Sequence, residues 1–566
     1  MKIENKVLDL SDDSKLSEED SKVLDSQIDY SIDKFNLFVS RLIKANKLSG
    51  KDLFLNVSSR DTSTSKTFDI CSKLNLIKLK NQQGHTPKLI KVTDEVFARL
   101  IEINYEQLGF GELPEVIYEK KQNLFFRIIK NFFVTFYLFI VCWIIFKLPR
   151  KNNIPSSKIT LVDNFIFKDS FAKDGYFYDR YYSGFEKFLS IEEQTQVWFS
   201  PTLIDIKNPL DFIKILIRSK KSKFNFIFEE SWLTISDLKN SLFSSLKSSQ
   251  KIKKIPDYEG LDLSPLIEEN LKRDIFSPGF AKAMNKYQYF RRIKKRGIKI
   301  NGFLNWFENQ TIDRAFNLSA KKFYPDVTTI GYQGYIFPKY ELHKNPIDLE
   351  IELNTIPNFL ALISEREIEK RKKFSRKINF ILAPALRYSY LENIQYKEPL
   401  NDLILFPLPI DINQSIQLIN FADQIDRFFD KEVEIVLKCH PKFSIKEFKA
   451  LVPASMNDKF FFSEESIEKL LTKASLVVSS ASTVCIEAAS VGIPVAIISN
   501  SSGLTRNPLP VPTENDLWAI IYNESDLSTL INKANKQEKK LNNNFFQRVE
   551  KSTVRTLFFF NNEIAI

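Results

Sequence analysis

The sequence of 566 residues is poor in cysteine, histidine and glycine, with four, three and 14 residues of these types. The cysteines lie far apart and form no CxxC pair, which disfavours a disulfide framework or a zinc site and indicates a reducing compartment. A histidine-based metal site would need His85, His343 and His440 to converge from three distant segments. We therefore expect neither a disulfide bond nor a metal site.

Residues 1–30 lack the basic start and the apolar core of a secretory signal peptide, so secretion is not indicated. The segment is polar and acidic, for example at residues 11–14 and 18–20. Low hydrophobicity combined with charge of one sign is typical of a disordered segment. We predict a disordered acidic tail over residues 1–30.

Positive charge is in excess, because 81 Lys and Arg residues against 70 Asp and Glu residues give a net charge of +11. Basic runs lie at residues 218–223, 291–296 and 371–377, and each alone is typical of a solvated helix face. The overall balance suits anionic partners such as nucleotide diphosphates, phospholipid headgroups or nucleic acid. Readers of nucleic acid usually interleave aromatic residues with the basic patch and carry a known module. We find neither and expect no nucleic-acid partner.

Residues 131–146 form the most apolar stretch of the chain. A helix of this length reaches about 24 Å, short of a hydrocarbon core of about 30 Å. Basic residues flank the stretch on both sides and therefore set no orientation. Three interpretations stay open: a helix lying in or dipping into one leaflet, a helix spanning the bilayer, and a buried core helix. We favour contact with a membrane.

From residue 158 the pattern alternates between strand and helix, as expected of an open parallel sheet. The apolar runs predict strands at 159–162, 224–228, 298–304 and 328–331. After Pro399 the pattern is clearer and predicts strands at 403–408, 433–438, 459–463, 476–480, 494–499 and 518–522. Helices are expected between these strands at 414–428, 466–473, 483–491 and 526–534. We predict α/β architecture with two Rossmann-like doubly wound domains facing a cleft, at 158–400 and 401–566, preceded by a region over 31–157 that carries the apolar helix.

Two loops at the carboxyl ends of predicted strands carry polar side chains, and ligands bind at such ends of a doubly wound sheet. In the first loop a strand ends directly in His440 and Pro441. The proline halts the strand and leaves the imidazole at the sheet edge, where it could donate to a phosphate or ribose oxygen. A histidine in that place can equally be structural.

The second loop leads into a helix through four hydroxyls within five positions: Ser479, Ser480, Ser482 and Thr483. Unpaired N–H groups and a partial positive charge at a helix start attract a phosphate. A plain N-cap needs only one hydroxyl. Glu487, about one turn into the helix, could take a ribose hydroxyl or complement the helix dipole.

Together these motifs, KCHP followed by SSASTVCIEAASVGIPV, resemble the donor-binding half of GT-B glycosyltransferases. The likeness is closest to bacterial sialyltransferases, polysialyltransferases and Kdo transferases that build capsules and lipopolysaccharide. In those enzymes an HP motif and an SS/ST motif hold the CMP of the donor. The resemblance implies that His440 and Pro441 contact the nucleotide and that Ser479, Ser480, Ser482 and Thr483 surround its phosphate.

The same family usually supplies a carboxylate base from an acidic pair followed by glycine at a strand end. Here Glu229 and Glu230 follow a strand, but Ser231 replaces the glycine. Glu308, just past another strand, is the second candidate, and inverting transfer needs one carboxylate within reach of the acceptor hydroxyl. The role stays open between Glu230 and Glu308. The segment containing Gln333 and Gly334 resembles a loop of surface-polysaccharide transferases and is expected in the acceptor region or the cleft.

Arg387 and Asn507 are two further polar points expected to face the cleft on the donor side. No convincing DxD pair follows a strand in a position to hold Mg²⁺ on a diphosphate, so we expect transfer without a metal, with helix dipoles and side chains stabilising the leaving phosphate. No cofactor is expected beyond the nucleotide-sugar substrate.

The leading hypothesis is a metal-independent transferase that moves a sugar, plausibly Kdo or a sialic-acid-like sugar from CMP, onto a bacterial surface polysaccharide or lipid-linked glycan. Its expected place is the cytoplasm, at the inner face of the membrane. Alternatives are a polyol-phosphate transferase of the teichoic-acid type, a nucleotide-sugar 2-epimerase, and a non-catalytic basic scaffold or nucleic-acid-binding protein. The epimerase should show several acids and a histidine in the cleft, which this histidine-poor chain hardly provides.

Overall fold

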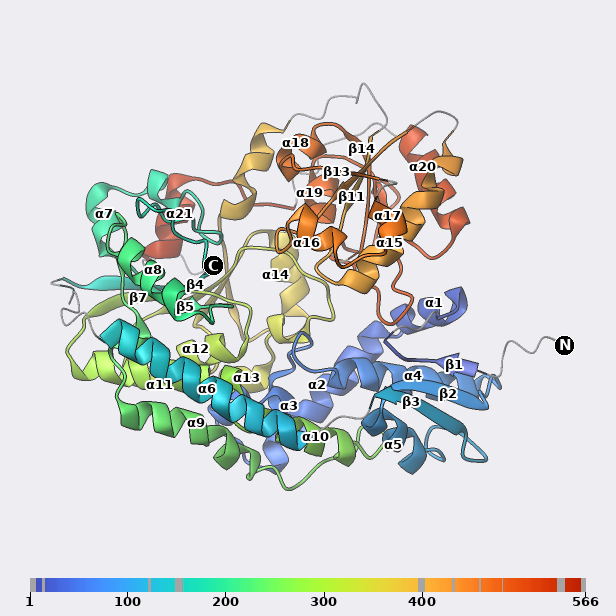
Figure 1. Ribbon diagram of the computed structural model, residues 1–566, viewed down its shortest axis with the longest axis horizontal. Coiled ribbons are helices and arrows are strands. Elements are labelled where there is room, and N and C mark those ends of the chain that lie inside the picture. The colour runs from blue at the N-terminus through green and yellow to red at the C-terminus, as the bar shows by residue number, and fades with distance from the viewer. Residues whose placement is uncertain are drawn as a thin grey trace.

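The computed structural model contains three parallel sheets, and Figure 1 shows the largest two side by side. The structure describes residues 7–12, 16–120, 124–147, 155, 157–394, 403–429, 433–457, 460–480, 482–536 and 545–560. The boundary predicted between residues 400 and 401 lies outside these ranges.

The seven-stranded sheet has the order β10-β9-β8-β7-β4-β5-β6, and all its pairs are parallel. β4 (Ile159–Ile166) and β5 (Val197–Leu203) are buried along their whole length, as central parallel strands must be. The other strands are β6 (Asn225–Phe226), β7 (Ile300–Trp306), β8 (Thr329–Gln333), β9 (Phe359–Leu362) and β10 (Asn379–Leu382). The four strands expected from the sequence are confirmed as β4, β6, β7 and β8.

β5 was not predicted from the sequence because Pro201 lies within it, and proline is rare in a central strand. The structure tolerates Pro201 because β6 pairs only with Trp198 and Phe199, so β5 has no neighbour on that side at Pro201. Three long helices cover this half of the molecule: α9 (Ile235–Ser249), α11 (Pro278–Lys295) and α12 (Thr311–Phe323).

The six-stranded sheet has the order β13-β12-β11-β14-β15-β16 and is also parallel. Its strands are β11 (Leu403–Pro407), β12 (Glu434–Lys438), β13 (Phe461–Phe462), β14 (Ala474–Ser479), β15 (Val495–Ile498) and β16 (Trp518–Ile521). Its helices include α15 (Ile412–Ile425), α18 (Ile467–Leu471), α19 (Val484–Ser490) and α20 (Glu524–Lys536). All six strands and four helices predicted for this half are confirmed.

The final helix, α21 (Lys551–Phe558), leaves the six-stranded sheet and packs on the seven-stranded one. Phe558 stacks on Phe185 at 4.7 Å between ring centroids and meets Tyr182 at 5.7 Å. The predicted unit 401–566 is therefore not one packing unit. Two parallel α/β domains, with the last helix returning to the first, form a GT-B architecture.

The N-terminal residues form a third, small sheet with the order β1-β2-β3: β1 (Val7–Asp9), β2 (Leu89–Asp94) and β3 (Glu115–Lys120). Around it lie α1 (Glu18–Ser26), α2 (Ile28–Ala45), α4 (Thr67–Gln82) and α5 (Glu95–Ile103). The expectation of disorder is wrong for residues 7–12 and 16–30, because Leu8, Leu10 and Leu24 are buried in the core between the charged positions.

The acidic residues of this segment also reach the C-terminal domain. The Asp25 carboxylate accepts hydrogen bonds from the Thr505 backbone N–H and the Tyr522 hydroxyl, both at 2.8 Å. A prediction of disorder from low hydrophobicity alone is therefore wrong for a segment whose carboxylates have specific partners.

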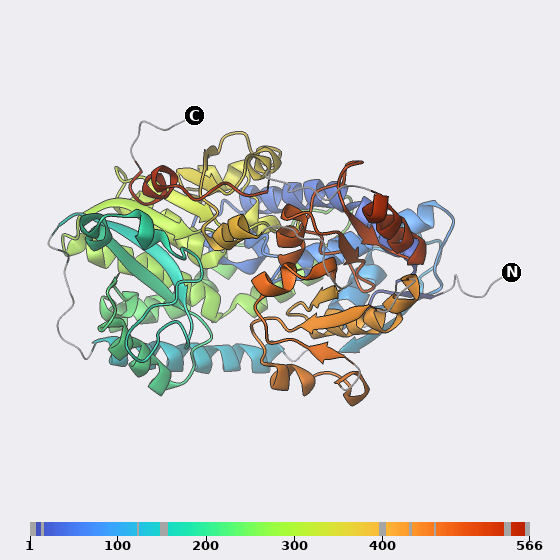
Figure 2. The same ribbon diagram turned by 90° about the horizontal axis from the view of Figure 1, so that it is seen from above.

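The apolar stretch belongs to α6 (Leu124–Lys147), which is longer than the predicted 131–146. It is long and apolar enough to cross a membrane, yet only 11% of its most apolar window is buried. The interpretation as a buried core helix is therefore wrong. Figures 1 and 2 show α6 running along one side of the N-terminal half, parallel to that surface.

Candidate functional site

The two loops singled out in the sequence lie at the same edge of the six-stranded sheet. β12, which precedes His440, and β14, which precedes Ser480, both pair with β11 in parallel. Their carboxyl ends are therefore one strand apart, a separation of about 10 Å. His440 and Ser482 are both partly exposed, so neither is sealed in the core.

His440 presents a defined donor nitrogen. Its Nδ1 accepts the backbone N–H of Lys442 at 3.1 Å, which leaves the proton of the neutral imidazole on Nε2. Burial, Lys442 and Arg387 together lower the pKa of His440. The ring is therefore neutral near pH 7, with an Nε2–H group to donate. Pro441 follows it on the exposed side.

The hydroxyls around α19 divide into two pairs. Ser479 is buried and donates to the Pro407 carbonyl at 2.6 Å, and Ser480 is buried with its hydroxyl 3.3 Å from the Gln414 side chain. Both hydroxyls therefore connect the end of β14 to neighbouring segments of the same chain. Ser482 accepts the Val484 N–H at 3.2 Å, and Thr483 is partly exposed beside it. Among the described residues of this loop, Ser482 thus remains at the helix start for an outside anion, whereas the Thr483 hydroxyl hydrogen-bonds to the Glu487 carboxylate.

Glu487 is buried and joins α19 to the connection between the domains. The hydroxyl of Tyr390 donates to its carboxylate at 2.5 Å. Burial raises the pKa of Glu487, and Tyr390, Arg387 and Thr483 oppose that shift. A buried carboxylate with this partner is better placed to hold Tyr390 in position than to bind a ribose hydroxyl.

Arg387 lies where the two domains meet. It is exposed and lies close to Glu487 of the C-terminal domain and to Tyr335 and Tyr181 of the N-terminal domain. Partial burial of the guanidinium lowers the pKa of Arg387, but Tyr388, Glu487, Tyr335 and Tyr181 outweigh it and raise the pKa, so the guanidinium stays cationic. It also acts on His440. A permanent positive charge therefore faces both sheets.

Asn507 holds its own loop together rather than facing a ligand. Its side-chain oxygen accepts the Leu509 N–H at 2.8 Å. The neighbouring Arg506, which the sequence analysis did not single out, carries charge toward Tyr340, Glu341 and Asp411, and Tyr340 is the largest cause of its raised pKa.

Glu308 follows β7, near the middle of the seven-stranded sheet, and is partly exposed. Its carboxylate accepts the Trp306 indole N–H at 2.8 Å and the Gln310 amide at 3.2 Å, and Lys344 Nζ lies 3.5 Å away. Burial would raise the pKa of Glu308, but Lys344, Trp306, His343 and Tyr335 outweigh it and lower the pKa. Glu308 is therefore an ionised acceptor of protons and hydrogen bonds.

Aromatic rings surround Glu308. Trp306 stacks on Tyr335 at 5.6 Å with the planes 5° apart, and Tyr181 lies 4.6 Å from Trp306. Tyr181 and Tyr335 are partly exposed, and both interact with Arg387 as well as Glu308. Flat, partly exposed rings beside a carboxylate and a cation suit the apolar faces of a sugar.

Glu230 lies elsewhere. It sits in a short turn, Glu229–Ser231, after the edge strand β6, three strands from β7. Its Oε2 atom is buried without a hydrogen-bond partner, and burial raises its pKa. The adjacent Glu229 has a pKa raised to about 8, mainly by burial. The structure therefore separates the two catalytic candidates and leaves only Glu308 near Arg387.

Gln333 and Gly334 hold the residues around Glu308 in place. Gln333 is buried, donates to the Lys344 carbonyl at 2.7 Å and accepts from Arg371 at 3.2 Å. A side chain at Gly334 would meet the Trp306 ring at 2.5 Å, so glycine is required for the tryptophan to pack. Neither residue is placed to touch a ligand directly.

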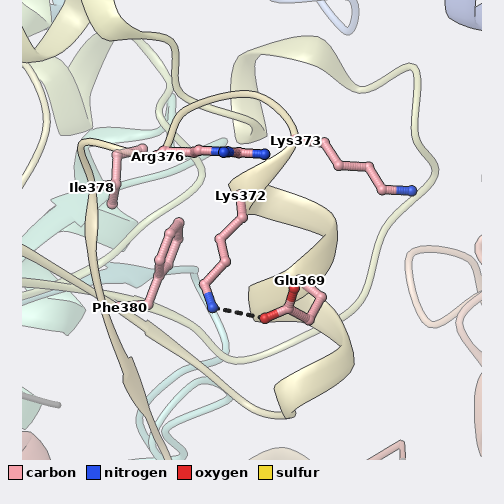
Figure 3. A pocket seen from close by; sticks show the side chains of 6 residues that line it. All are labelled: Glu369, Lys372, Lys373, Arg376, Ile378 and Phe380. Atoms are coloured by element: carbon pink, nitrogen blue, oxygen red, sulfur yellow. Dashed lines mark hydrogen bonds and ion pairs between the residues drawn. The ribbon is translucent and has the colours of Figure 1, made fainter.

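Cavities elsewhere are less suited to a ligand. One of about 510 Å³ lies between α14 (Glu365–Lys372) and the edge strand β10. Figure 3 shows that its Lys372 pairs with Glu369, at 2.7 Å, while Lys373 points away from the apolar side chains Ile378 and Phe380. The convergent polar groups lie around Arg387 instead.

Solved structures similar to this chain include sugar-nucleotide enzymes. A UDP-N-acetylglucosamine 2-epimerase is 12% identical, with a TM-score of 0.36, covering 71% of this chain and 94% of that one. The lipopolysaccharide outer core galactosyltransferase WaaB is 10% identical, with a TM-score of 0.36 and the same two coverages, 71% and 94%. The glycosyltransferase SnogD from Streptomyces nogalater is 10% identical, with a TM-score of 0.30, covering 61% and 83%.

No family model and no curated protein matches the chain. At these identities and TM-scores the likeness carries no functional argument. The function is therefore argued from the side chains.

Proposed function

We propose that the protein is a glycosyltransferase that binds a nucleotide-activated sugar at the carboxyl edge of the six-stranded sheet and an acceptor hydroxyl beside Glu308. The observation that carries the proposal is that His440 and Ser482 follow two strands that flank β11 at the same carboxyl edge of the six-stranded sheet. The exposed cation Arg387 lies close to His440 and Glu487 on that side and to Tyr335 on the other. One positive charge thus serves both halves of the reaction.

In the proposed reaction Glu308 takes the proton of the acceptor hydroxyl, and the acceptor oxygen attacks the anomeric carbon of the donor. The bond from that carbon to the leaving phosphate oxygen breaks, and its electron pair stays on the phosphate. Arg387, the His440 Nε2–H and the start of α19 stabilise the developing negative charge. Attack opposite the leaving group inverts the anomeric configuration.

Three finer features belong to the same proposal. The donor is CMP-linked and of the Kdo or sialic-acid type, supported by the HP and SS/ST motifs, whereas two similar solved structures are complexes with UDP and with thymidine diphosphate. Transfer needs no metal. The acceptor is a surface polysaccharide or a lipid-linked glycan, and the enzyme works peripherally at the inner face of the cytoplasmic membrane.

The donor assignment is tested by thermal shift against CMP, CDP, UDP and GDP. We expect CMP to raise the melting temperature, His440→Ala to abolish the rise, and His85→Ala, an exposed histidine far along the chain, to keep it. Addition of EDTA should leave the shift intact. A rise with UDP alone would overturn the CMP assignment and keep the transferase proposal, whereas no response to any nucleotide would overturn both.

A further inference from the structure

One side of α6 is apolar and open to solvent. Its exposed residues recur every three or four positions, which places them on one face of the helix. A contiguous patch of large apolar side chains is rarely exposed to solvent on a soluble monomer. The members, between 38% and 75% exposed, are Phe125, Phe126, Ile129, Phe133, Val134, Phe136, Tyr137 and Ile144.

The opposite side of α6 is fixed to the N-terminal domain. Thr135 donates to the Phe276 carbonyl at 3.1 Å, and the Trp143 indole donates to the Leu233 carbonyl at 2.9 Å. Near the end of the helix, Phe146 lies 4.7 Å from Phe228. Figure 2 shows the helix flat along the edge of the molecule. Crossing a bilayer would require all these contacts to break.

Neighbouring helices extend the exposed apolar surface. Phe243 of α9 lies 6.4 Å from Phe132 of α6 and is itself exposed. α8 (Pro209–Ser219) packs beside the end of α6 through Phe212 and Phe146, 6.5 Å apart. Figure 1 shows α6 between α8 and α9 on the near side of the molecule. We call this surface, made by the exposed residues of α6 with Leu210, Ile213, Ile217, Ile235 and Phe243, the apolar face.

Positive charge predominates on the three helices of the apolar face. The three helices carry seven basic residues and two acidic ones, Asp211 and Asp237. Asp237 is buried and already bound by Arg291 and Arg292, so it adds little negative charge to the surface. The basic residues are Arg127, Lys130, Lys147, Lys214, Arg218, Lys239 and Lys247.

We propose that the apolar face docks onto a bilayer that contains anionic lipids, with α6 lying in the plane of one leaflet. Aromatic and aliphatic side chains enter the boundary between headgroups and acyl chains, to a depth of about 5–10 Å. The surrounding lysines and arginines meet the lipid phosphates. A helix about 36 Å long gives this contact the extent of a membrane anchor without crossing the membrane. This inference does not depend on the transferase chemistry.

The test is flotation of the full-length protein with vesicles of phosphatidylcholine, with or without phosphatidylglycerol. We expect binding to the anionic vesicles, weaker binding to the neutral ones, and release as salt rises. Phe126→Asp with Phe133→Asp should weaken binding about tenfold or more, since two large apolar side chains leave the lipid. Val511→Asp, at a residue 87% exposed in the C-terminal domain, is the matched control and should bind like the parent.

Circular dichroism and the melting temperature without added ligand show whether the double variant is folded. Three results would overturn the proposal. The folded double variant could bind vesicles as well as the parent. Light scattering without lipid could show that the parent is a dimer and the double variant a monomer, in which case a second copy covers the apolar face. Trypsin added outside the vesicles could cut at Lys120 but spare Arg150, which would mean that α6 crosses the bilayer.

Discussion

Two groups of carboxylates follow strands of the seven-stranded sheet, and their surroundings make them chemically different. Glu308 is partly exposed, close to Lys344, and has a lowered pKa. Glu229 is buried and Glu230 is partly exposed beside α6, and burial raises the pKa of each. Their cation, Lys286, lies 2.6 Å from Asp163 and 3.8 Å from Glu229. The surroundings therefore favour the ionised form of Glu308 and the protonated form of Glu229 and Glu230.

The largest expected effect is loss of sugar transfer in Glu308→Gln. The amide keeps the size of the carboxylate but cannot take a proton, so kcat should fall about 10²–10⁴-fold. Glu230→Gln, the matched variant in the other group, should stay within a few-fold of the parent. The measurement is release of nucleotide from the donor with acceptor present. Comparable losses in both variants, with both folded, would contradict the assignment of Glu308 as the base.

A second prediction concerns stability in the enclosed group. Because the pKa of Glu229 is about 8 when folded and 4.5 as the ordinary value, the folded state holds the proton longer than the unfolded chain. The stability of the parent protein should therefore fall as pH rises from about 5 to about 8. Glu229→Gln should match the parent at the acid end and exceed it by about 1–3 kcal/mol at pH ~9.

Urea unfolding of both proteins across that pH range measures this difference. Glu192→Gln, a change at an exposed glutamate, provides the control and should show no such divergence. A parent protein that gained stability relative to Glu229→Gln with rising pH would show that Glu229 is ionised in the fold, and the contrast between the two groups would fail.

The smallest expected effect comes from Lys344→Met, which removes the cation next to Glu308. Lys344 is the largest of the influences that lower the pKa of Glu308, so that pKa should rise in the variant. The base must be deprotonated to act, and the acid limb of the kcat/KM profile should move to higher pH. Lys372→Met, at an exposed lysine paired only with Glu369, should leave the profile in place.

The six-stranded sheet was predictable because most of its strands are short runs rich in Val, Ile and Leu between turns, although β13 is only Phe461–Phe462. The seven-stranded sheet was only partly predictable. β5 contains Pro201, and β9 and β10 were not expected from the sequence. The small N-terminal sheet was missed because β1 pairs with β2, some eighty residues later in the sequence, a contact that no local pattern carries.

The candidate site shows the same division. His440 and Arg387 were found because one ends a strand before proline and the other precedes the second domain. Tyr181, Tyr335 and Lys344 come from separate loops and meet only in the folded chain, so the surroundings of Glu308 could not be predicted. The hydroxyl cluster was overestimated, since Ser479 and Ser480 use their hydroxyls to hold the sheet together.

The return of α21 to the first domain has a consequence for synthesis on the ribosome. Phe558 completes an aromatic cluster with Phe185 and Tyr182, residues made more than 370 positions earlier. The first domain therefore emerges with part of its hydrophobic surface uncovered and stays so until nearly the whole chain has been translated. During that interval the nascent chain must be shielded from aggregation, by chaperones or by its own unfinished partners.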